Sequence, residues 1–455
     1  MLTNEELDKV IKAYDIRGLV GEEITPEFTF VLGTAFARFL MEEREPARVV
    51  IGEDMRPSSD ELATAFADGL NSQGLDAIRI GLASTDMLYF ASGSLNLPGA
   101  MFTASHNPAA YNGIKMAKSG ARPIGSESGL LRIKYLMREG IPMSMGALGR
   151  TSTMELLEGY VDYLLSLFSV NEFTSGRKLK VVVDAGNGMA GFTAPALFSR
   201  LNVEITPLYF ELDGNFPNHE ANPIDPKNLK ELVKKVREEK ADIGLAFDGD
   251  ADRCFLVDEK GDVVNPSALT ALIAIRELKR KPGSSIIYNL ISSKAVPEII
   301  KEQGGTPLRS RVGHSYIKQL MAESGAIFGG EHSGHFYFDG FWRADSGALA
   351  ALFAIAELSH SNLPLSELLA PLNRYFSSGE INTIVADTGK SIDLVKATFG
   401  ANYEIDDLDG ITVSAADWWF NLRPSNTEPL LRLNVEAHSK EQMLKVSKEV
   451  LALIR

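Results

Sequence analysis

The chain has 455 residues, of which 45% are hydrophobic and 23% are charged, and its formal net charge is −14. This length allows about three or four domains, each with its own core, and the composition is that of an ordinary globular protein. The acidic balance argues against nucleic acid as a partner, because binding to a phosphate backbone usually needs a basic face.

Neither export nor membrane insertion is expected. The amino-terminal residues are charged from Glu5 onward and lack the apolar run of a secretory signal. The most apolar stretch, residues 348–358, is too short to span a bilayer and predicts a buried helix. The single cysteine, Cys254, excludes an internal disulfide framework and suits a reducing compartment, so we expect a cytoplasmic protein.

Short β-rich runs alternate with longer amphipathic stretches, which is the pattern of α/β layers. In chain order the sequence predicts a strand at 48–51, a helix at 58–71, and strands at 178–183, 241–247 and 285–290. Most of these strands lead into a polar or glycine-rich turn, where α/β proteins usually place their ligands.

Turn-rich breaks at residues 142–149, 257–261 and 371–379 divide the chain into four predicted domains. Their predicted limits are residues 1–148, 149–258, 259–370 and 371–455.

The first motif that carries chemistry is TASHNP, residues 103–108, which is followed by Lys115. Ser105 stands in a loop stiffened by Pro108, so its hydroxyl can be held outward as an attacking or phosphoryl-carrying group. An ordinary Ser/Asn turn is the alternative. Because adjacent side chains rarely face each other, His106 is expected to orient the loop and not to form a Ser-His pair.

A second motif, GNGMAG at residues 186–191, follows a predicted strand and matches a dinucleotide-binding fingerprint. It supports an NAD-dependent oxidoreductase as a distant alternative, with Glu204, Glu211 and Asp213 as possible ribose acids. A tight turn from strand to helix needs glycines in any case, so the fingerprint is weak.

The third motif is DGDADR, directly after the apolar run that ends at residue 247. Carboxylates at Asp248, Asp250 and Asp252 can converge from one side of an extended loop and offer the hard oxygen ligands that Mg²⁺ prefers. A calcium-binding EF-hand is excluded, because Arg253 stands where that loop needs glycine and the flanking segments resemble strands. A solvated acidic turn remains an alternative.

Two later motifs fit the recognition of a sugar phosphate. In GGEHSGH, residues 329–335, Glu331 and Ser333 can hydrogen-bond vicinal sugar hydroxyls, whereas the two histidines lack zinc-site spacing. RPSNTEP begins at Arg423, whose guanidinium and neighbouring donors can hold a phosphate, although a plain turn would also explain it. The neighbouring donors are Ser425, Asn426 and Thr427.

Taken together and in order, TASHNP, DGDADR, GEHSGH and RPSNTEP resemble the α-D-phosphohexomutase family, which comprises phosphomannomutases and phosphoglucomutases. The likeness covers nearly the whole chain and includes the segments at residues 14–18, 213–218 and 312–315. It implies an α/β fold with four domains around a central cleft. Three would be related α/β domains with mixed sheets, and the last a smaller α+β domain.

The resemblance also implies roles for individual residues. Ser105 would carry a phosphoryl group, and Asp248, Asp250 and Asp252 would bind one Mg²⁺ together with a phosphoserine oxygen. The residues near the transferred group would be Arg17, Lys115, Arg253 and His314. The substrate-binding residues would be Tyr14, Glu331, Ser333, Arg423, Ser425, Asn426 and Thr427. Some bacterial relatives place a lysine before a Cys-Thr-Arg-Arg run where this chain has NLISSK, so a role for Lys294 is left open.

The implied activity is that of an isomerase, an intramolecular phosphotransferase, that interconverts hexose 1-phosphates and 6-phosphates. A hexose 1,6-bisphosphate would be its intermediate and activator, and its partners would be hexose phosphates. Mannose is the expected sugar with glucose as a further substrate, and a phosphoglucosamine mutase or phosphoglucomutase is the alternative. A monomer or weak homodimer is expected.

Overall fold

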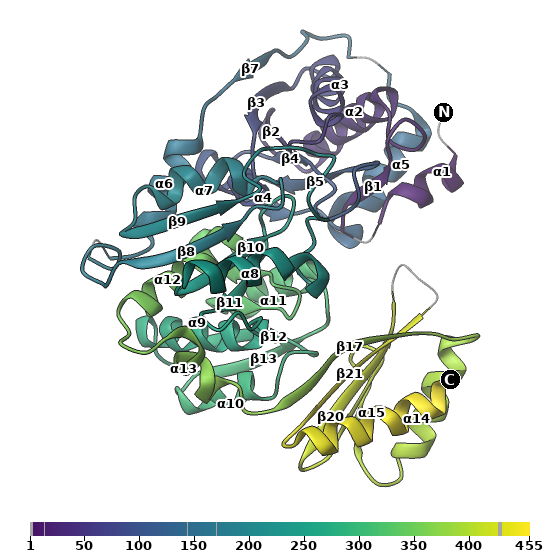
Figure 1. Cartoon of the computed structure of the whole chain (residues 1–455). Helices are drawn as coiled ribbons and strands as arrows, with labels where there is room; N and C mark the ends of the chain where they lie inside the picture. The colour runs from purple at the N-terminus through teal and green to yellow at the C-terminus, as the bar shows by residue number, and fades with distance from the viewer. Residues whose placement is uncertain (1–2, 13, 143, 170, 426–429) are drawn as a thin grey trace. The chain divides into compact units, whose positions relative to one another are not determined.

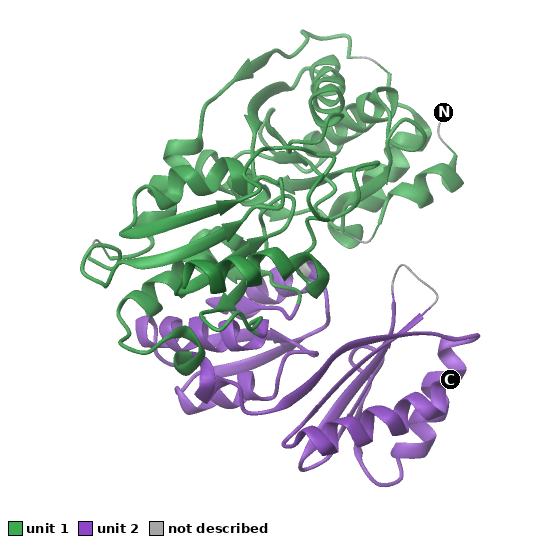
Figure 2. Ribbon diagram, viewed as in Figure 1, with its two compact units in different colours: residues 1–264, 333–368 green, residues 265–332, 369–455 purple. Residues whose placement is uncertain are grey.

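The structure is a computed structural model that describes residues 3–12, 14–142, 144–169, 171–425 and 430–455 (Figure 1). The chain forms two compact units, which Figure 2 distinguishes by colour. Unit 1 comprises residues 1–264 and 333–368, and unit 2 comprises residues 265–332 and 369–455. Each unit is described by itself.

The first sheet of unit 1 has the strand order β1-β5-β4-β2-β3-β7, and β6 pairs with β5. Strand β2 runs parallel to β3 and β4, whereas β5 is antiparallel to β1 and β4. The strands are β1 (Ile16–Leu19), β2 (Arg48–Glu53), β3 (Asp76–Leu82), β4 (Gly99–Phe102), β5 (Tyr111–Lys118), β6 (Arg122–Pro123) and β7 (Thr151–Thr153). The helices of this part are α1 (Asn4–Val10), α2 (Pro26–Glu42), α3 (Ser59–Ser72), α4 (Thr85–Leu95) and α5 (Leu131–Glu139), the last preceded by a π-helical turn, Ser126–Leu130.

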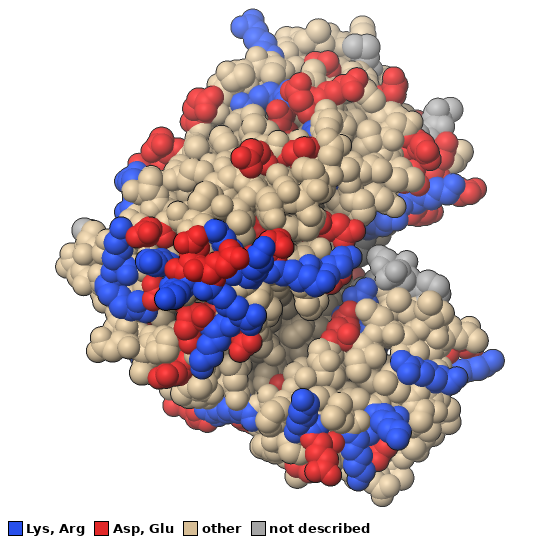
Figure 3. Space-filling model, viewed as in Figure 1, with Lys and Arg blue, Asp and Glu red and all other residues tan. Residues whose placement is uncertain are grey.

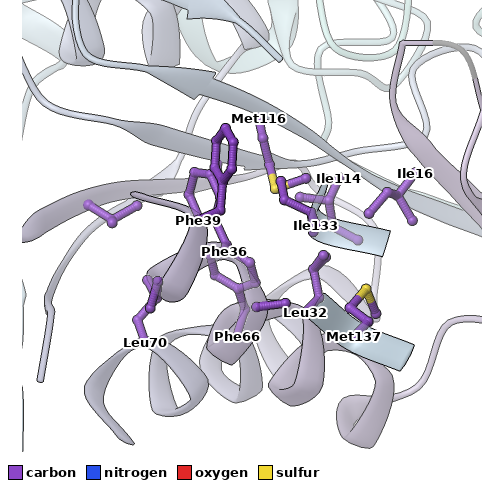
Figure 4. Close-up of a cluster of buried hydrophobic side chains, with 14 of the residues drawn as sticks. Ile16, Leu32, Phe36, Phe39, Phe66, Leu70, Ile114, Met116, Ile133 and Met137 are labelled. Atoms are coloured by element: carbon purple, nitrogen blue, oxygen red, sulfur yellow. The ribbon is translucent and has the colours of Figure 1, made fainter. Parts of the chain in front are cut away.

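Helices α2 and α3 pack closely on one another and bury an aromatic cluster against the sheet. A Cβ atom on Gly33 would overlap the carbonyl of Phe66, so glycine allows the two helices their close approach. The rings of Phe36 and Phe66 lie 5.8 Å apart, and Phe66 meets Phe102 edge-on at 5.5 Å. Figure 4 shows these helix side chains facing the aliphatic residues of β5. The packed core gives β2 and β4 a rigid base beneath the loops that follow them.

The second sheet of unit 1 has the order β11-β10-β8-β9, in which β8, β9 and β10 are parallel and β11 is antiparallel to β10. Its strands are β8 (Leu179–Asp184), β9 (Val203–Leu208), β10 (Ile243–Phe247) and β11 (Cys254–Asp258). The remaining elements of this unit include α6 (Leu157–Ser166), α7 (Ala190–Phe198), a 3₁₀ helix (Pro226–Leu229), α8 (Lys230–Glu239), β15 (Phe336–Phe338), a 3₁₀ helix (Asp339–Phe341), β16 (Ala344–Asp345) and α12 (Gly347–Ser359). On the face shown in Figure 3, charges of both signs lie over α8, where Lys235 pairs with Glu239 at 2.7 Å.

Unit 2 contains a parallel group of strands and a separate antiparallel sheet. In the parallel group, β12 (Ser285–Asn289) lies between β13 (Thr306–Ser310) and β14 (Phe328–Gly330), with helices α9 (Pro266–Arg280), α10 (Ala295–Glu302) and α11 (His314–Ser324). The antiparallel sheet has the order β17-β21-β20-β19-β18, and helices α14 and α15 cover one face of it (Figure 1). Its elements are β17 (Phe376–Ile384), α14 (Thr388–Phe399), β18 (Glu404–Asp406), β19 (Ile411–Ser414), β20 (Trp418–Pro424), β21 (Leu430–Ala437) and α15 (Lys440–Ile454). A short helix α13 (Leu365–Leu369) and a 3₁₀ turn (Ala370–Leu372) precede β17 along the chain.

The strands and helices predicted from sequence are present, with ends shifted by one or two residues. The predicted helix at 58–71 is α3, for which Ser58 is the residue before the first turn. The predicted strands are β2, β8, β10 and β12, and the apolar run at 348–358 is the buried helix α12. Among the described residues, no helix combines the length and the apolar character needed to cross a membrane.

Candidate active site

Ser105 lies in the loop between β4 and β5 of unit 1 in an uncommon backbone conformation. Its φ is +50°, a left-handed value that non-glycine residues rarely adopt, and the residue is only 4% exposed. Its backbone N–H donates to Thr103 Oγ1 at 2.9 Å, and its own hydroxyl donates to Asp248 Oδ2 at 2.8 Å. The serine and the aspartate loop, predicted separately, therefore meet in one place.

The aspartate loop follows β10 and brings three buried carboxylates together. One oxygen from each of Asp248, Asp250 and Asp252 lies within 4.8 Å of the others. Thr85, at the start of α4, donates its hydroxyl to Asp250 Oδ2 at 2.5 Å and its N–H to the Asp250 carbonyl at 3.0 Å. Within the described part of the chain, Asp250 Oδ1 and Asp252 Oδ1 are buried and have no hydrogen-bond partner. Such oxygens suit a hard cation, because an unpaired buried carboxylate oxygen is costly.

Two cations from different elements neutralise much of this charge. Lys115 on β5 lies opposite Met101 of β4, and its ammonium donates to Asp250 Oδ2 at 2.7 Å and to Asp252 Oδ2 at 2.6 Å. Arg253 Nε donates to Asp248 Oδ2 at 2.7 Å. A third cation, Arg17 on β1, reaches the serine loop by donating to Asn107 Oδ1 at 2.6 Å.

The electrostatics of these buried groups follow from their partners. Burial alone would raise the pKa of Asp250, but the Lys115 ammonium lowers that pKa well below its usual range. Burial raises the pKa of Asp248, an effect only partly offset by Arg253. For Lys115, desolvation is outweighed by Asp250 and Asp252, so its pKa rises well above normal and the side chain is an ammonium in this arrangement.

The expectation that the adjacent side chains of Ser105 and His106 do not face each other is wrong, whereas an orienting role for His106 stays a prediction. His106 Nδ1 lies 3.2 Å from Ser105 Oγ, because the left-handed backbone at Ser105 turns the two neighbouring side chains to the same side. Arg253 Nη2 donates to this Nδ1 atom. Burial, followed by the charges of Arg253 and Arg17, lowers the pKa of His106 well below its ordinary value, so the ring is neutral near pH 7.

His335 is a site residue that the sequence reasoning considered only as a zinc ligand and set aside. Residue 335 forms a β-bridge with Arg253, which brings its ring to the aspartate loop. His335 Nε2 lies 3.6 Å from Asp252 Oδ1 and 3.8 Å from Asp345 Oδ2, and its Nδ1 is 2.9 Å from Ser333 Oγ. Ser333, predicted to bind sugar, is therefore next to the Asp252 side of the cluster. The sequence feature that could have indicated a site role for His335 is its spacing from Ser333, which stands two residues earlier and was itself predicted to bind substrate.

The glycines of GNGMAG have a structural role beside the aspartate loop. Strands β8 and β10 are parallel, so the turns that follow them lie at the same edge of the sheet. Met189 N–H donates to the Gly249 carbonyl at 2.8 Å, and a Cβ atom on Gly188 would lie 2.6 Å from that oxygen. The glycine spacing thus serves close packing between two turns. The structure also excludes an EF-hand, because strands β10 and β11 flank the loop. Glu259 stands at the twelfth position counted from Asp248, where an EF-hand has a glutamate ligand, but it accepts a hydrogen bond from the Ser366 N–H at 3.0 Å instead.

In unit 2, two arginines face each other on neighbouring strands. Arg423 on β20 is paired in register with Arg432 on β21, and Glu380 on β17 receives one hydrogen bond of 3.1 Å from each. Arg432 Nη2 also donates to Ser425 Oγ at 3.3 Å. Like charges opposite each other in a sheet are destabilising, so this pair suits an anion site. Arg432 was missed because the predicted motif ended at residue 429.

The remaining predicted site residues lie outside the aspartate cluster and the arginine pair, or outside the described part of the structure. The Gly313 N–H donates to Glu331 Oε1 at 3.2 Å within unit 2, and Tyr14 is half-buried just before β1 in unit 1. His314 begins α11, but its side chain lies outside the described part of the structure, as do Asn426 and Thr427. The backbone N–H of Lys294 donates to Glu436 Oε2 at 2.9 Å, and burial lowers the pKa of the Lys294 ammonium.

Four family models, all of the phosphoglucomutase/phosphomannomutase family, match this chain in succession. Three describe α/β/α domains I, II and III and match residues 8–140, 158–261 and 265–375, and the fourth describes the C-terminal domain and matches residues 380–453. The chain belongs to this phosphohexomutase family. The predicted family and the predicted fold class, three α/β domains followed by a domain with an antiparallel sheet, are confirmed.

Individual relatives agree with the family models over the full length. A phosphomannomutase of Salmonella montevideo is 39% identical over 454 residues, which covers 97% of this chain and 98% of the relative. A protein of Xanthomonas campestris named as phosphohexose mutases is 38% identical and covers 98% of each chain. The crystal structure of a phosphoglucomutase/phosphomannomutase family protein from Burkholderia thailandensis has a TM-score of 0.90 and 31% identity, covering 100% of this chain and 97% of that one.

Proposed function

We propose that this phosphohexomutase interconverts the 1- and 6-phosphates of a hexose through a phosphorylated Ser105 and a hexose 1,6-bisphosphate. The observation that carries the proposal is the contact between Ser105 Oγ and Asp248 Oδ2, at 2.8 Å, inside a cluster that also contains Lys115 and Arg253. A serine hydroxyl between carboxylates and cations suits a group that holds a phosphoryl group and releases it again.

The acidic cluster fits Mg²⁺. Its donors are carboxylate oxygens alone, and the buried Oδ1 atoms of Asp250 and Asp252 have no hydrogen-bond partner among the described residues. Asp248, Asp250 and Asp252 would hold one ion, together with an oxygen of phosphorylated Ser105. When bound, Mg²⁺ would neutralise charge on the phosphoryl oxygens.

In the proposed reaction the bond between phosphorus and Ser105 Oγ breaks while a new bond forms between phosphorus and a sugar hydroxyl oxygen. Of the two predicted candidates for the base, Lys115 is an ammonium in this arrangement and would stabilise the transferring group by its charge. His314 is therefore proposed to accept the proton of that sugar hydroxyl, and the departing Ser105 Oγ takes up a proton. The bisphosphate then presents its other phosphate to Ser105, and the reverse transfer restores the phosphorylated enzyme. Arg253 and Arg17 would stabilise the transferring group by charge and position.

Substrate-binding roles are proposed for further residues. Glu331 and Ser333 are proposed to bind vicinal sugar hydroxyls, with Tyr14 as a further contact. Arg423 and Ser425, with Asn426 and Thr427, are proposed to bind the phosphate that is not being transferred. The pairing of Arg423 with Arg432 supports the last role, because two facing guanidinium groups favour a dianion.

We further propose mannose phosphates as preferred substrates and glucose phosphates as secondary ones. The names of the relatives support this order, since several are phosphomannomutases. A cytoplasmic location is proposed on the same basis as before, the single buried cysteine Cys254.

A coupled assay tests the proposal. The purified chain is given mannose 1-phosphate or glucose 1-phosphate with Mg²⁺ and a priming amount of the matching 1,6-bisphosphate, and formation of the 6-phosphate is followed. Turnover that is lost in Ser105→Ala and retained in Ser119→Ala, a serine outside the TASHNP loop, is the expected result. Full activity in Ser105→Ala would refute the proposed mechanism.

A further inference from the structure

Arg56 is buried beneath the loop that carries Ser105, and none of the motifs above includes it. Its side chain is fully buried, with 0% exposure. The guanidinium donates hydrogen bonds to four backbone carbonyls of residues 105–111. Nη2 bonds the carbonyls of Ser105 at 2.9 Å and Asn107 at 2.7 Å, while Nη1 bonds those of Pro108 and Tyr111, each at 2.9 Å.

The sheet explains why Arg56 reaches this loop. Strands β2 and β4 are parallel neighbours, with Glu53 in register with Phe102, so the segments that follow them leave the same edge of the sheet side by side. The Asp54 N–H continues the pairing by donating to the Phe102 carbonyl at 2.9 Å. Three residues after this pair, in the segments that follow the two strands, Arg56 and Ser105 lie next to one another.

The guanidinium is itself held rigidly. Its Nε lies 3.2 Å from Asp54 Oδ2, while Asp54 Oδ1 accepts hydrogen bonds from the Arg56 N–H at 3.0 Å and from Ser59 Oγ at 2.6 Å. The ring of Phe216 packs over the guanidinium, with 5.1 Å between its centroid and Arg56 Cζ. These contacts come from the segment after β2, from α3 and from residues 213–218. They leave the Arg56 guanidinium little freedom to move when Ser105 gains or loses a phosphoryl group.

Ser105 needs such support because its conformation is strained. A non-glycine residue at a φ of +50° persists only where its surroundings hold it there. Arg56 binds the Ser105 carbonyl, and Gly249 of the aspartate loop lies against the same oxygen, which a Cβ atom at residue 249 would overlap. With its carbonyl fixed between these two residues, Ser105 directs its hydroxyl toward Asp248.

We propose that Arg56 is a positioning residue for Ser105, one that acts through the backbone of residues 105–111 and not on the phosphoryl group itself. This inference rests on the proposed phosphoserine mechanism. It predicts a loss in the transfer step with little change in substrate binding, because a misplacement of a reacting group by about 1 Å can lower a rate on the order of a hundredfold.

The test compares Arg56→Met and Arg56→Lys with Arg79→Met as the control. Arg79 is also largely buried in unit 1, but its partners are Glu53, Asp60 and Thr64, on β2 and α3. We expect kcat to fall about a hundredfold in Arg56→Met, with KM within threefold of wild type. Arg56→Lys should show a smaller loss, since an ammonium can serve only some of the four carbonyls. Arg79→Met should keep its kcat.

A second readout separates positioning from general destabilisation. Phosphorylation of Ser105 by a hexose 1,6-bisphosphate, followed by intact mass over time, should slow in both Arg56 variants by the same factor as kcat. Guanidinium ion at millimolar concentration should partly restore kcat in Arg56→Ala, whereas equal NaCl should not.

Several results would overturn the inference. One is a folded Arg56→Met enzyme with kcat within threefold of wild type, and another is wild-type kcat in Arg56→Lys when Arg56→Met does not fold. Failure of both variants to fold would show that Arg56 maintains the fold and is not a positioning residue. A wild-type chain that is active on hexose phosphates but never phosphorylated on Ser105 would instead refute the proposed mechanism, independently of the Arg56 variants.

Discussion

The aspartate loop of unit 1 and the arginine pair of unit 2 concentrate charge of opposite sign. Asp248, Asp250 and Asp252 concentrate negative charge, two of them held by the Lys115 ammonium. Arg423 and Arg432 concentrate positive charge, and the Glu380 carboxylate bridges them. Each region thus gathers like charges that a fold alone would avoid. The first suits a cation and the second an anion, as Mg²⁺ and a phosphate would require.

The two regions also differ in how they are held. The carboxylates are fixed by hydrogen bonds from α4, β5 and Arg253, whereas the two arginines share the carboxylate of Glu380 on β17. We therefore expect changes at the aspartate loop to act on the rate of transfer, and changes at the arginine pair to act on binding.

Asp250→Asn should have the largest effect. Asp250 is proposed to bind Mg²⁺, and loss of its carboxylate would remove charge stabilisation that matters most during transfer. We therefore expect kcat to fall about a thousandfold or more and KM to change little. Steady-state kinetics at saturating Mg²⁺ measure it. Asp262→Asn, at a side chain that is 74% exposed, is the control and should match wild type. An unchanged kcat in Asp250→Asn would mean that the three carboxylates form only a structural turn.

Gly249→Ala should have the next largest effect, a drop in kcat of roughly tenfold to a hundredfold. The added methyl group would overlap the Ser105 carbonyl and shift the serine from its place beside Asp248. Gly159→Ala is a matched control, because a Cβ atom there meets only the Phe90 ring, at an ordinary contact distance of 3.7 Å. Equal kcat values in the two variants would show that the backbone at Ser105 need not be held so closely.

Arg432→Met should act on binding and not on rate. We expect KM for a hexose phosphate to rise about tenfold, with kcat within threefold, because a charge-assisted hydrogen bond to phosphate is worth roughly 1.5–3 kcal/mol. Arg374→Met removes a comparable arginine–glutamate contact of unit 2, with Glu302 at 2.6 Å, and should leave KM unchanged. A tenfold fall in kcat without a change in KM would place Arg432 at the transfer step instead.

The smallest expected effect is the preference between mannose and glucose phosphates. We expect the vicinal hydroxyls bound by Glu331 and Ser333 to be O3 and O4, because these can be held in both orientations of the bisphosphate. The two sugars differ only at C2, so discrimination should be about 1–2 kcal/mol. Competition between the two 1-phosphates at limiting concentration gives the ratio of their kcat/KM values. A ratio beyond about a thousandfold would require a direct contact to O2.

Contiguous motifs were predictable from the sequence, whereas contacts between distant segments were not. Ser105 and the three aspartates stand in compact motifs whose residue types predict a phosphoryl-carrying serine and a metal-binding loop. The apolar run before the aspartates also predicted strand β10. Thr85 and Arg56 reach the site only because the sheets bring distant turns together, and Arg56 binds carbonyl groups, which every residue has. The available signal was an arginine two residues after Asp54, which itself directly follows a buried strand. His106 was misjudged because the left-handed backbone at Ser105 has no signature in residue type.

The most direct test of the account is whether Ser105 accepts a phosphoryl group. The dephosphorylated protein, with Mg²⁺, is incubated with mannose 1,6-bisphosphate or glucose 1,6-bisphosphate and analysed by intact mass and peptide mapping, with Ser105→Ala treated in parallel. We predict one added phosphoryl group, located on Ser105, in the wild-type chain and none in the variant. A wild-type chain that interconverts hexose phosphates without ever carrying phosphate on Ser105 would contradict the account.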